Sequence, residues 1–368
     1  MPPQNQQLRV LIVRLGAMGD ILHALPAITA LRAARADWYI GWAVEPQWRG
    51  LLCAECSSPP SGRSPQMPLV DAIHIIPAKQ WARYPLSAAL HEIPRVRREL
   101  RESRYDIAID LQGAVRSAVI ARWTRAERII GEDKPRERAA RWLFTERIPT
   151  SGVHVIEQGI EVANAVLGES LSFAPPLLPA EKSAEQEAAA IPQPFVLLSP
   201  GAGWGAKRWP IDRYAAVARQ LSRDGYNIVI NAGPGEEAIG IDLMYQLSGA
   251  SGITTLQPSL TELIALTRCA SLVIAVDTGP LHLACALGKP VVGIFGPTDP
   301  ARNGPFGCAF RVLRHPESRR DHTRHSEPEA GLLTITPESV LGAAMDLLRA
   351  TKTESLPGSL RESRGKCL

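Results

Sequence analysis

Short apolar runs alternate with amphipathic stretches along most of this chain. The apolar runs are rich in Val, Ile and Leu, as expected for strands buried on both faces, and glycine-rich or polar turns lead from them into segments with helical spacing. This alternation predicts an α/β fold with doubly wound parallel sheets. The predicted strands cover residues 8–15, 39–44, 72–76, 105–111, 128–131, 195–199, 227–231, 252–256, 271–276 and 291–295. The clearest predicted helices cover residues 21–35, 86–103, 155–167, 211–224, 259–268 and 338–349.

Prolines mark a boundary near the middle of the chain. Five of them, between residues 175 and 194, bracket a polar segment rich in Glu and Ala, which is typical of a linker. The predicted parts are a Rossmann-like domain at 1–174, a linker at 175–194, a second Rossmann-like domain at 195–335, a helix at 336–350 and a polar tail at 351–368. Doubly wound sheets bind ligands at the carboxyl ends of their strands, so we expect a cleft between two facing domains.

The strand before residue 277 predicts a binding site for anions. It runs into Asp277, Thr278 and Gly279, which are residue types that begin helices, and Pro280 suits the first helical position. The exposed N–H groups of that first turn and the positive end of the helix dipole attract anions. His282 lies in the same turn and can add a donor. The alternative is a well-capped helix behind a core strand.

The first strand ends in a glycine turn, Gly16-Ala17-Met18-Gly19-Asp20. The two glycines permit a tight turn and a close approach of the backbone to a ligand. Asp20 stands at the predicted start of a helix, where a carboxylate is also a common cap. Capping and catalysis are compatible here, because a cap at the carboxyl edge of a sheet also faces the ligand.

The loop from Gly201 to Lys207 resembles a phosphate loop but fails the usual motifs. Ala206 precedes the lysine and Arg208 follows it, whereas a Walker A loop has Gly before and Ser or Thr after. The glycine spacing also departs from the dinucleotide fingerprint. Because no Asp-x-Asp pair occurs in the sequence, a departing diphosphate would rely on Lys207 and backbone N–H groups. Glu236 is either an acceptor for ribose hydroxyls or an acid of a first helical turn.

Composition and charge exclude several other classes. The net charge is only +4, but thirteen arginines lie between residues 95 and 147, which indicates either a solvated helical surface or a site for an anionic partner. Aromatic residues make up 5% of the chain and no recognition motif occurs, so a nucleic-acid partner is not expected. Cys53 and Cys56 form an isolated C-x-x-C that fits a helix end better than a metal or redox site. No apolar run approaches the ~20 residues of a membrane helix and no secretory signal is recognisable, so we expect a cytoplasmic location.

Five motifs occur in an order typical of one enzyme family. They are Gly16-Ala17-Met18-Gly19-Asp20, Asp110-Leu111-Gln112-Gly113-Ala114-Val115-Arg116-Ser117, Pro200-Gly201-Ala202 with Lys207-Arg208-Trp209-Pro210, Asp277-Thr278-Gly279-Pro280-Leu281-His282, and Gly296-Pro297-Thr298-Asp299-Pro300. From about Leu8 to Arg349 the chain resembles the bacterial glycosyltransferases of family 9, the lipopolysaccharide heptosyltransferases. The first-half motifs and the Gly296 motif are more similar to heptosyltransferase I, and the Pro-Gly-Ala loop to heptosyltransferase II.

The resemblance implies a GT-B fold and sugar transfer with inversion, without a metal or other cofactor. It implies that the second domain binds ADP-heptose and that the first binds a lipid-linked Kdo sugar, the Kdo-lipid A acceptor. A monomer in peripheral contact with the cytoplasmic face of the inner membrane is then expected, through the basic first domain.

The resemblance also assigns roles to individual residues. Asp20 takes the place of the general base, Lys207 meets the diphosphate and Glu236 holds the ribose. The other residues implied on the donor side are Gly201, Ala202, Asp277, Thr278, Gly279 and His282. On the acceptor side the candidates are Gly19, Lys79, Arg83 and Arg116.

Three alternatives stay open at this stage. The chain could be heptosyltransferase II or another family 9 enzyme with a different sugar or acceptor, or a nucleotide-sugar-binding protein without catalysis. Retention of both Asp20 and Lys207 argues against the last. Many relatives have Ser or Thr where Ala17 stands, so a hydroxyl contact to the acceptor is absent here.

Overall fold

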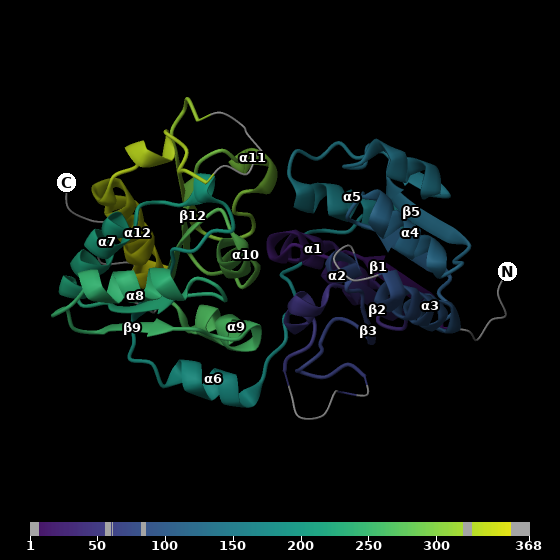
Figure 1. Ribbon diagram of the computed structural model, residues 1–368, viewed down its shortest axis with the longest axis horizontal. Coiled ribbons are helices and arrows are strands. Elements are labelled where there is room, and N and C mark those ends of the chain that lie inside the picture. The colour runs from purple at the N-terminus through teal and green to yellow at the C-terminus, as the bar shows by residue number, and fades with distance from the viewer. Residues whose placement is uncertain (1–6, 56–59, 61, 82–85, 319–325, 355–368) are drawn as a thin grey trace, which may run out of the picture. The chain divides into compact units, whose positions relative to one another are not determined.

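The computed structural model describes residues 7–55, 60, 62–81, 86–318 and 326–354, and it divides into two compact units. Unit 1 comprises Met1–Ala189, Ser259–Leu266 and Ala301–Asn303, and unit 2 comprises Ala190–Pro258, Thr267–Pro300 and Gly304–Leu368. The main change from unit 1 to unit 2 falls within the predicted linker. Each unit contains a six-stranded parallel sheet with helices on both faces (Figure 1), so the predicted α/β architecture is confirmed.

In unit 1 the strands follow the order β3-β2-β1-β4-β5-β6, the classic doubly wound arrangement. The strands are β1 (Arg9–Val13), β2 (Tyr39–Val44), β3 (Ala72–Ile75), β4 (Ile107–Asp110), β5 (Arg128–Glu132) and β6 (Glu146–Ile148). The helices are α1 (Met18–Ala34), α2 (Ala78–Trp81), α3 (Leu86–Glu102), α4 (Val115–Trp123), α5 (Val155–Leu167) and α6 (Lys182–Ala189). Two 3-10 helices, η1 (Pro46–Leu51) and η2 (Arg138–Leu143), lie between strands.

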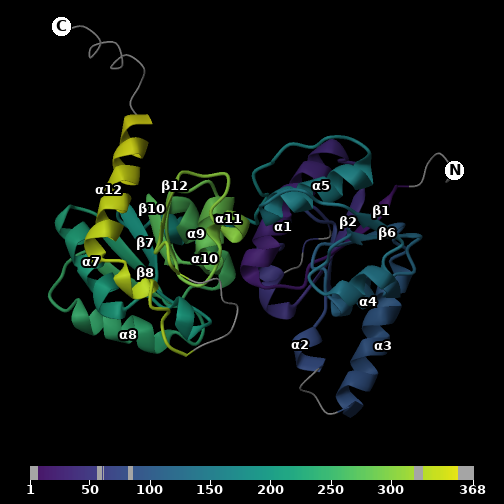
Figure 2. The same cartoon turned by 90° about the horizontal axis from the view of Figure 1, so that it is seen from above.

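The core of unit 1 follows from the alternation of side chains along its strands. Leu11 and Val13 of β1 point to the same face, where they pack with buried residues of α3 and α4. Helices α1 and α5 cover the opposite face (Figure 2). Because the strands are buried from both sides, nearly every position in β1, β2 and β4 is apolar.

Unit 2 repeats the arrangement with the order β12-β11-β10-β7-β8-β9. Its strands are β7 (Phe195–Ser199), β8 (Asn227–Asn231), β9 (Ile253–Leu256), β10 (Leu272–Val276), β11 (Val291–Phe295) and β12 (Phe310–Arg314). The helices are α7 (Ile211–Arg223), α8 (Glu237–Gln246), α10 (Gly279–Ala286) and α12 (Pro337–Glu354), with 3-10 helices η3 (Gly205–Lys207) and η4 (Leu332–Thr334). Helices α9 (Leu260–Cys269) and α11 (Pro300–Asn303) lie mostly in the two short segments assigned to unit 1. Helices α7, α8 and α12 cover one face of the sheet and α10 packs on the other.

The structure corrects several predicted boundaries. Helix α1 begins at Met18, three residues before the predicted start, because the Asp20 carboxylate accepts the N–H of Ala17 and closes the first turn. Pro280 is the second residue of α10 rather than the first, since Gly279 opens the helix. The predicted tail at 351–368 begins inside α12, which continues to Glu354. Cys53 follows a 3-10 helix, and Cys56 lies outside the described residues.

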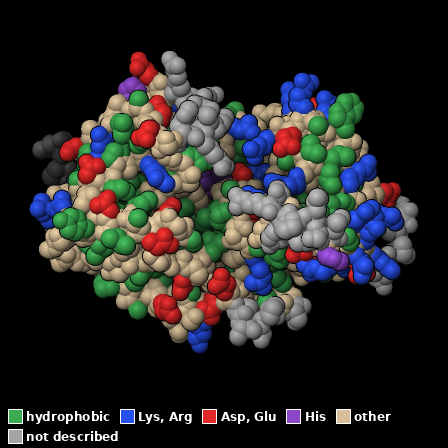
Figure 3. Space-filling view, viewed as in Figure 1, with side chains coloured by type: hydrophobic (Ala, Val, Ile, Leu, Met, Phe, Trp, Pro, Cys, Tyr) green, Lys and Arg blue, Asp and Glu red, His purple; other side chains and the backbone are tan. Residues whose placement is uncertain are grey.

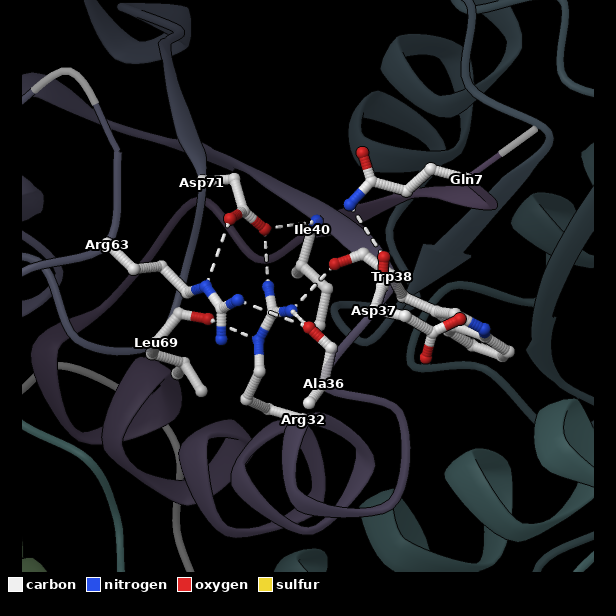
Figure 4. A network of polar contacts seen from close by, with 9 residues as sticks. All are labelled: Gln7, Arg32, Ala36, Asp37, Trp38, Ile40, Arg63, Leu69 and Asp71. Atoms are coloured by element: carbon white, nitrogen blue, oxygen red, sulfur yellow. Dashed lines mark hydrogen bonds and ion pairs between the residues drawn. The ribbon is translucent and has the colours of Figure 1, made fainter. Parts of the chain in front are cut away.

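An arginine cluster links the end of α1 to described residues of the loop between β2 and β3. Figure 4 shows Arg32 of α1 pointing into a ring of acceptors, and its side chain is only 4% exposed. Its guanidinium donates to the backbone oxygens of Leu69 and Trp38 and pairs with Asp71. Asp71 also pairs with Arg63 of the loop, at 3.2 Å. Burial lowers the pKa of Arg32, and the Asp71 carboxylate opposes that shift. This cluster is structural, because it ties the loop to the end of α1.

Candidate active site

The loops with candidate chemistry in unit 1 follow β1 and β4, the two strands at which the strand order reverses. Such a topological switch point is where doubly wound sheets bind ligands. Val13 pairs in register with Asp110, so both loops leave the sheet at the same level. Asp20 and the predicted Asp110–Ser117 motif are therefore neighbours in the fold.

Asp20 is held by Arg14, the residue directly after β1. The guanidinium of Arg14 lies 3.0 Å from Asp20 Oδ1 and donates to the backbone oxygens of Asp20 and Leu111. The other carboxylate oxygen, Oδ2, accepts the N–H of Ala17 at 3.0 Å. The Asp20 side chain nevertheless stays 32% exposed. It is thus an oriented carboxylate that is open to solvent.

The Asp110 carboxylate organises the neighbouring loop instead of facing solvent. Asp110 is 1% exposed and accepts from the N–H groups of Gln112 (2.8 Å) and Gly113 (3.0 Å) and from the hydroxyl of Ser117 (2.8 Å). Burial raises its pKa to about 6, against the opposing effect of these donors. Gln112 in turn accepts the N–H of Leu15 at 2.9 Å. This chain of bonds locks the β4 loop to the β1 loop that carries Asp20.

The predicted acceptor residues are less closely grouped. Gly19 is the second residue of α1, next to Asp20, and Arg116 is an exposed residue in the first turn of α4. Lys79, which is 57% exposed, lies 3.4 Å from the buried carboxylate of Glu45 beyond the end of β2. Arg83 lies outside the described residues.

In unit 2 the corresponding loops, after β7 and β10, bring together Lys207, Asp277 and His282. Lys207 Nζ lies 2.6 Å from Asp277 Oδ2 and 3.1 Å from its backbone oxygen, and His282 Nε2 lies 3.1 Å from Oδ1. Burial by itself raises the pKa of Asp277, but the hydrogen bond from His282 and the charges of His282 and Lys207 outweigh it and lower that pKa well below its usual range. Asp277 is therefore ionised, and it fixes both nitrogen-bearing side chains beside the start of α10.

The first turn of α10 supplies backbone donors at the same point. Thr278 is the N-cap residue, but its hydroxyl donates to the backbone oxygen of Val276 and accepts no N–H of the first helical turn. The N–H of Gly279 opens the helix and so has no acceptor within it. Thr278 is thus confirmed as the residue that begins this helix, whereas the anion site stays a prediction.

Glu236 lies against Gly201, although 35 residues separate them in the sequence. A Cβ atom added at Gly201 would fall 1.9 Å from Oε2 of Glu236, so only glycine leaves room for this carboxylate. Glu236 also accepts the N–H of Gly233 at 3.1 Å, and burial raises its pKa. It is the N-cap residue of α8, not an acid of its first turn. The methyl group of Ala202, in contrast, is buried in the core, which leaves only its backbone for a ligand.

Two residues were missed by the sequence reasoning. Arg14 is a charged residue that directly follows a fully buried strand, and this position was a signal that could have found it. Glu132 ends β5 at the same edge of the sheet, and burial raises its pKa while the charge of Arg14 opposes the shift. Among the residues the structure describes, no group of three or more His, Cys, Asp or Glu side chains could hold a metal ion. Within the same residues, no helix combines the length and the apolar character needed to cross a bilayer.

Solved structures with the same architecture include several transferases. The Escherichia coli heptosyltransferase WaaC with ADP aligns at a TM-score of 0.75 and 24% identity, covering 92% of this chain and all of that one. A glycosyltransferase family 9 protein from Veillonella parvula aligns at a TM-score of 0.77 and 21% identity, covering 94% and 99%. These likenesses establish the GT-B fold, with two Rossmann-like domains in one chain, as predicted.

Sequence comparison identifies the family. The lipopolysaccharide heptosyltransferase 1 of Salmonella typhimurium is 27% identical over 348 residues, which is 91% of this chain and 99% of that protein. The protein of the same name from Pseudomonas aeruginosa is 26% identical over 314 residues, 82% of each chain. The model of glycosyltransferase family 9 (heptosyltransferase) matches residues 93–332, well over half of the sequence. The chain therefore belongs to glycosyltransferase family 9 and is a glycosyltransferase.

Proposed function

We propose that this enzyme transfers heptose from ADP-heptose to a Kdo sugar of the lipopolysaccharide inner core, on a lipid A-Kdo acceptor. Family membership and the names of the relatives support the class of reaction. The observation that carries the donor assignment is the group of Lys207, Asp277 and His282 at the start of α10, with Glu236 beside Gly201. These residues offer the three kinds of contact that a nucleotide diphosphate sugar needs: a cation, helix N–H groups and a carboxylate for a ribose.

On the donor side, each group has a separate task. Lys207 and the first N–H groups of α10 bind the diphosphate and stabilise the negative charge that develops as ADP departs. Asp277 holds Lys207 and His282 in position through both of its oxygens. Glu236 accepts from the ribose hydroxyls, a common use of carboxylates in nucleotide sites. The backbone of Gly201 and Ala202 borders the same site.

On the acceptor side, Asp20 acts as the general base. The acceptor hydroxyl oxygen attacks the anomeric carbon of the heptose as the bond to ADP breaks, and Asp20 takes the hydroxyl proton. Attack from the face opposite ADP inverts the anomeric configuration. Arg14 orients the Asp20 carboxylate through its contact with Oδ1, at 3.0 Å. No metal is needed in this scheme, because the diphosphate charge is met by Lys207 and backbone dipoles.

Positive side chains would bind the anionic acceptor. Lys79 and Arg116 are the described candidates, with Gly19 next to the base, and the sequence adds Arg83. Because the acceptor is a lipid, we propose that the enzyme works as a monomer in peripheral contact with the cytoplasmic face of the inner membrane. This contact should weaken with salt.

The proposal is tested by incubating the protein with a panel of ADP- and UDP-sugars and Kdo-lipid A, and identifying products by mass. A heptosylated Kdo-lipid A from ADP-heptose supports it. A product formed only from another nucleotide sugar would mean that the proposed donor is wrong. A product formed only from an acceptor that already carries heptose would mean that the proposed acceptor is wrong. Binding of ADP-heptose without any transfer would show a non-catalytic protein.

A further inference from the structure

The segment from residue 133 to 147 in unit 1 exposes an unusual aromatic side chain. Trp142, in the 3-10 helix η2, is 77% exposed, and the guanidinium carbon of Arg141 lies 5.7 Å from its ring centroid. Exposure of a whole indole to water is unfavourable, since Trp carries a large apolar surface. Tryptophan is one of the two side chains that are enriched at the boundary between a bilayer and water.

Four cations lie close to this tryptophan in the sequence. Among the described residues, no ion pair involves Lys134, Arg136, Arg138 or Arg147, and all four are exposed. Arg141, by contrast, pairs with Asp133 at 3.2 Å. Figure 3 shows that Lys and Arg side chains are frequent on the visible surface of unit 1.

The acids of the segment neutralise these cations only in part, because two of the three acids are paired with other arginines. Asp133 pairs with Arg141, and Glu146 pairs with Arg128 at 2.6 Å. Glu137 accepts the N–H of Val115 at 2.8 Å, at the start of α4. The segment therefore presents an excess of positive charge next to an exposed indole.

The exposed apolar side chains of α8 lack this charge pattern. Ile241 and Tyr245 of α8 are 71% and 80% exposed, but their helix carries Glu237 and Asp242 and no Lys or Arg. An apolar residue among acids does not suit an anionic surface. The two patches thus differ in charge while they are similar in apolar exposure.

The basic segment is also fixed to the edge of the sheet that carries Asp20. The N–H of Glu137 donates to the backbone oxygen of Gly113 at 2.8 Å, and a Cβ added at Gly113 would fall 2.9 Å from the backbone nitrogen of Arg136. Gly113 belongs to the loop that Asp110 organises. A partner bound by the segment would therefore lie at the acceptor side of unit 1.

We propose that residues 133–147, with Trp142 as the apolar anchor and Lys134, Arg136, Arg138 and Arg147 as cations, dock the enzyme on an anionic phospholipid surface. The indole enters the interfacial layer while the cations meet lipid phosphates, each cation contributing about fivefold to the partition. This inference depends on the proposed function in one respect, namely that the acceptor is a membrane lipid. It concerns the bilayer itself and not the acceptor.

The test is sedimentation of the full chain with acceptor-free vesicles of equal parts phosphatidylglycerol and phosphatidylethanolamine, against vesicles of phosphatidylcholine alone. Trp142→Ala should lower the partition onto the anionic vesicles roughly tenfold, and the double variant Arg136→Ala/Arg138→Ala about thirtyfold, with a weaker salt dependence. Tyr245→Ala is the matched control and should sediment like the unmodified chain. Circular dichroism checks that each variant is folded.

A second readout separates docking from chemistry. With a deacylated, water-soluble acceptor, the Trp142 and double-arginine variants should transfer the sugar at the unmodified rate. If both variants sediment like the unmodified chain, or if the unmodified chain does not bind the acceptor-free anionic vesicles, the docking surface is wrong. Failure of transfer to the soluble acceptor by the unmodified chain would contradict the proposed function instead, and leaves the vesicle result standing.

Discussion

The contact between Gly201 and Glu236 offers a sharp test of the donor site. Substitution Gly201→Ala puts a Cβ atom 1.9 Å from the Glu236 carboxylate, which then has to leave its position. Because that carboxylate is the far end of a flexible side chain, it can swing aside and the protein still folds. The cost to stability should be about 1 kcal/mol, from the lost acceptor for the Gly233 N–H.

The cost to donor binding should be larger. A hydrogen bond between a charged carboxylate and a ribose hydroxyl contributes about 1.5–3 kcal/mol, so its loss weakens ADP binding roughly 10- to 150-fold. Isothermal titration with ADP measures this directly. Gly203→Ala is the matched control, because a Cβ at Gly203 meets no atom within 4 Å, and it should bind ADP normally.

A double-mutant cycle with Glu236→Ala shows whether the effect acts through this carboxylate. In the Glu236→Ala background, the added Gly201→Ala change should cost little, since the group it displaces is already gone. Two results would refute the reasoning: normal ADP affinity in Gly201→Ala, or full additivity of the two changes. Additivity would mean that Gly201 contacts the nucleotide independently of Glu236.

Three further predictions address the diphosphate site, the metal and the acceptor loop. Lys207→Met should weaken ADP binding and also cost roughly 3 kcal/mol of stability, because it leaves the buried Asp277 carboxylate with His282 alone. Adding Asp277→Asn to this variant should restore the melting temperature but not the affinity for ADP. If both are restored, the role of Lys207 is purely structural. Transfer should continue in excess EDTA, whereas a loss of activity that Mg²⁺ reverses would overturn the metal-free scheme. The pKa of Asp110 is raised to about 6, so its protonated form adds stability that is complete below its ordinary pKa of 3.8 and is lost as the pH rises through about 6. Chemical denaturation from pH 4 to 7 should show this decline, and it should be smaller in Asp110→Asn, because only the buried carboxyls of Glu132 and Glu236 then contribute to it.

The sequence predicted the central strands well because their burial on both faces leaves a continuous apolar signal. The structure has β2 at Tyr39–Val44, β8 at Asn227–Asn231 and β11 at Val291–Phe295, the predicted bounds in each case. The edge strands β6 and β12 were missed. Strand β6 has three residues, and in β12 the apolar positions are interrupted by Arg311 and Arg314 and Phe310 is exposed, so neither shows a continuous apolar run.

Only part of the candidate site could be predicted from the sequence, because contacts between distant loops leave no local sequence pattern. The strand–turn–helix pattern pointed to Asp20 and to Asp277 directly. Nothing in the spacing indicated that Glu236 lies against Gly201, or that Arg14 holds Asp20. Asp110 opens one of the five sequence motifs, but its buried position and its role in fixing the loop depend on bonds to three partners along that loop.

The central claim is that Asp20 accepts the proton of the acceptor hydroxyl during heptose transfer. The most direct measurement is a single-turnover reaction of ADP-heptose with Kdo-lipid A, followed by mass spectrometry, for the unmodified enzyme and for Asp20→Asn. The account predicts heptosylated product from the unmodified enzyme, and a rate about 10²- to 10⁴-fold lower for Asp20→Asn with unchanged ADP affinity. Equal rates for the two proteins would contradict it.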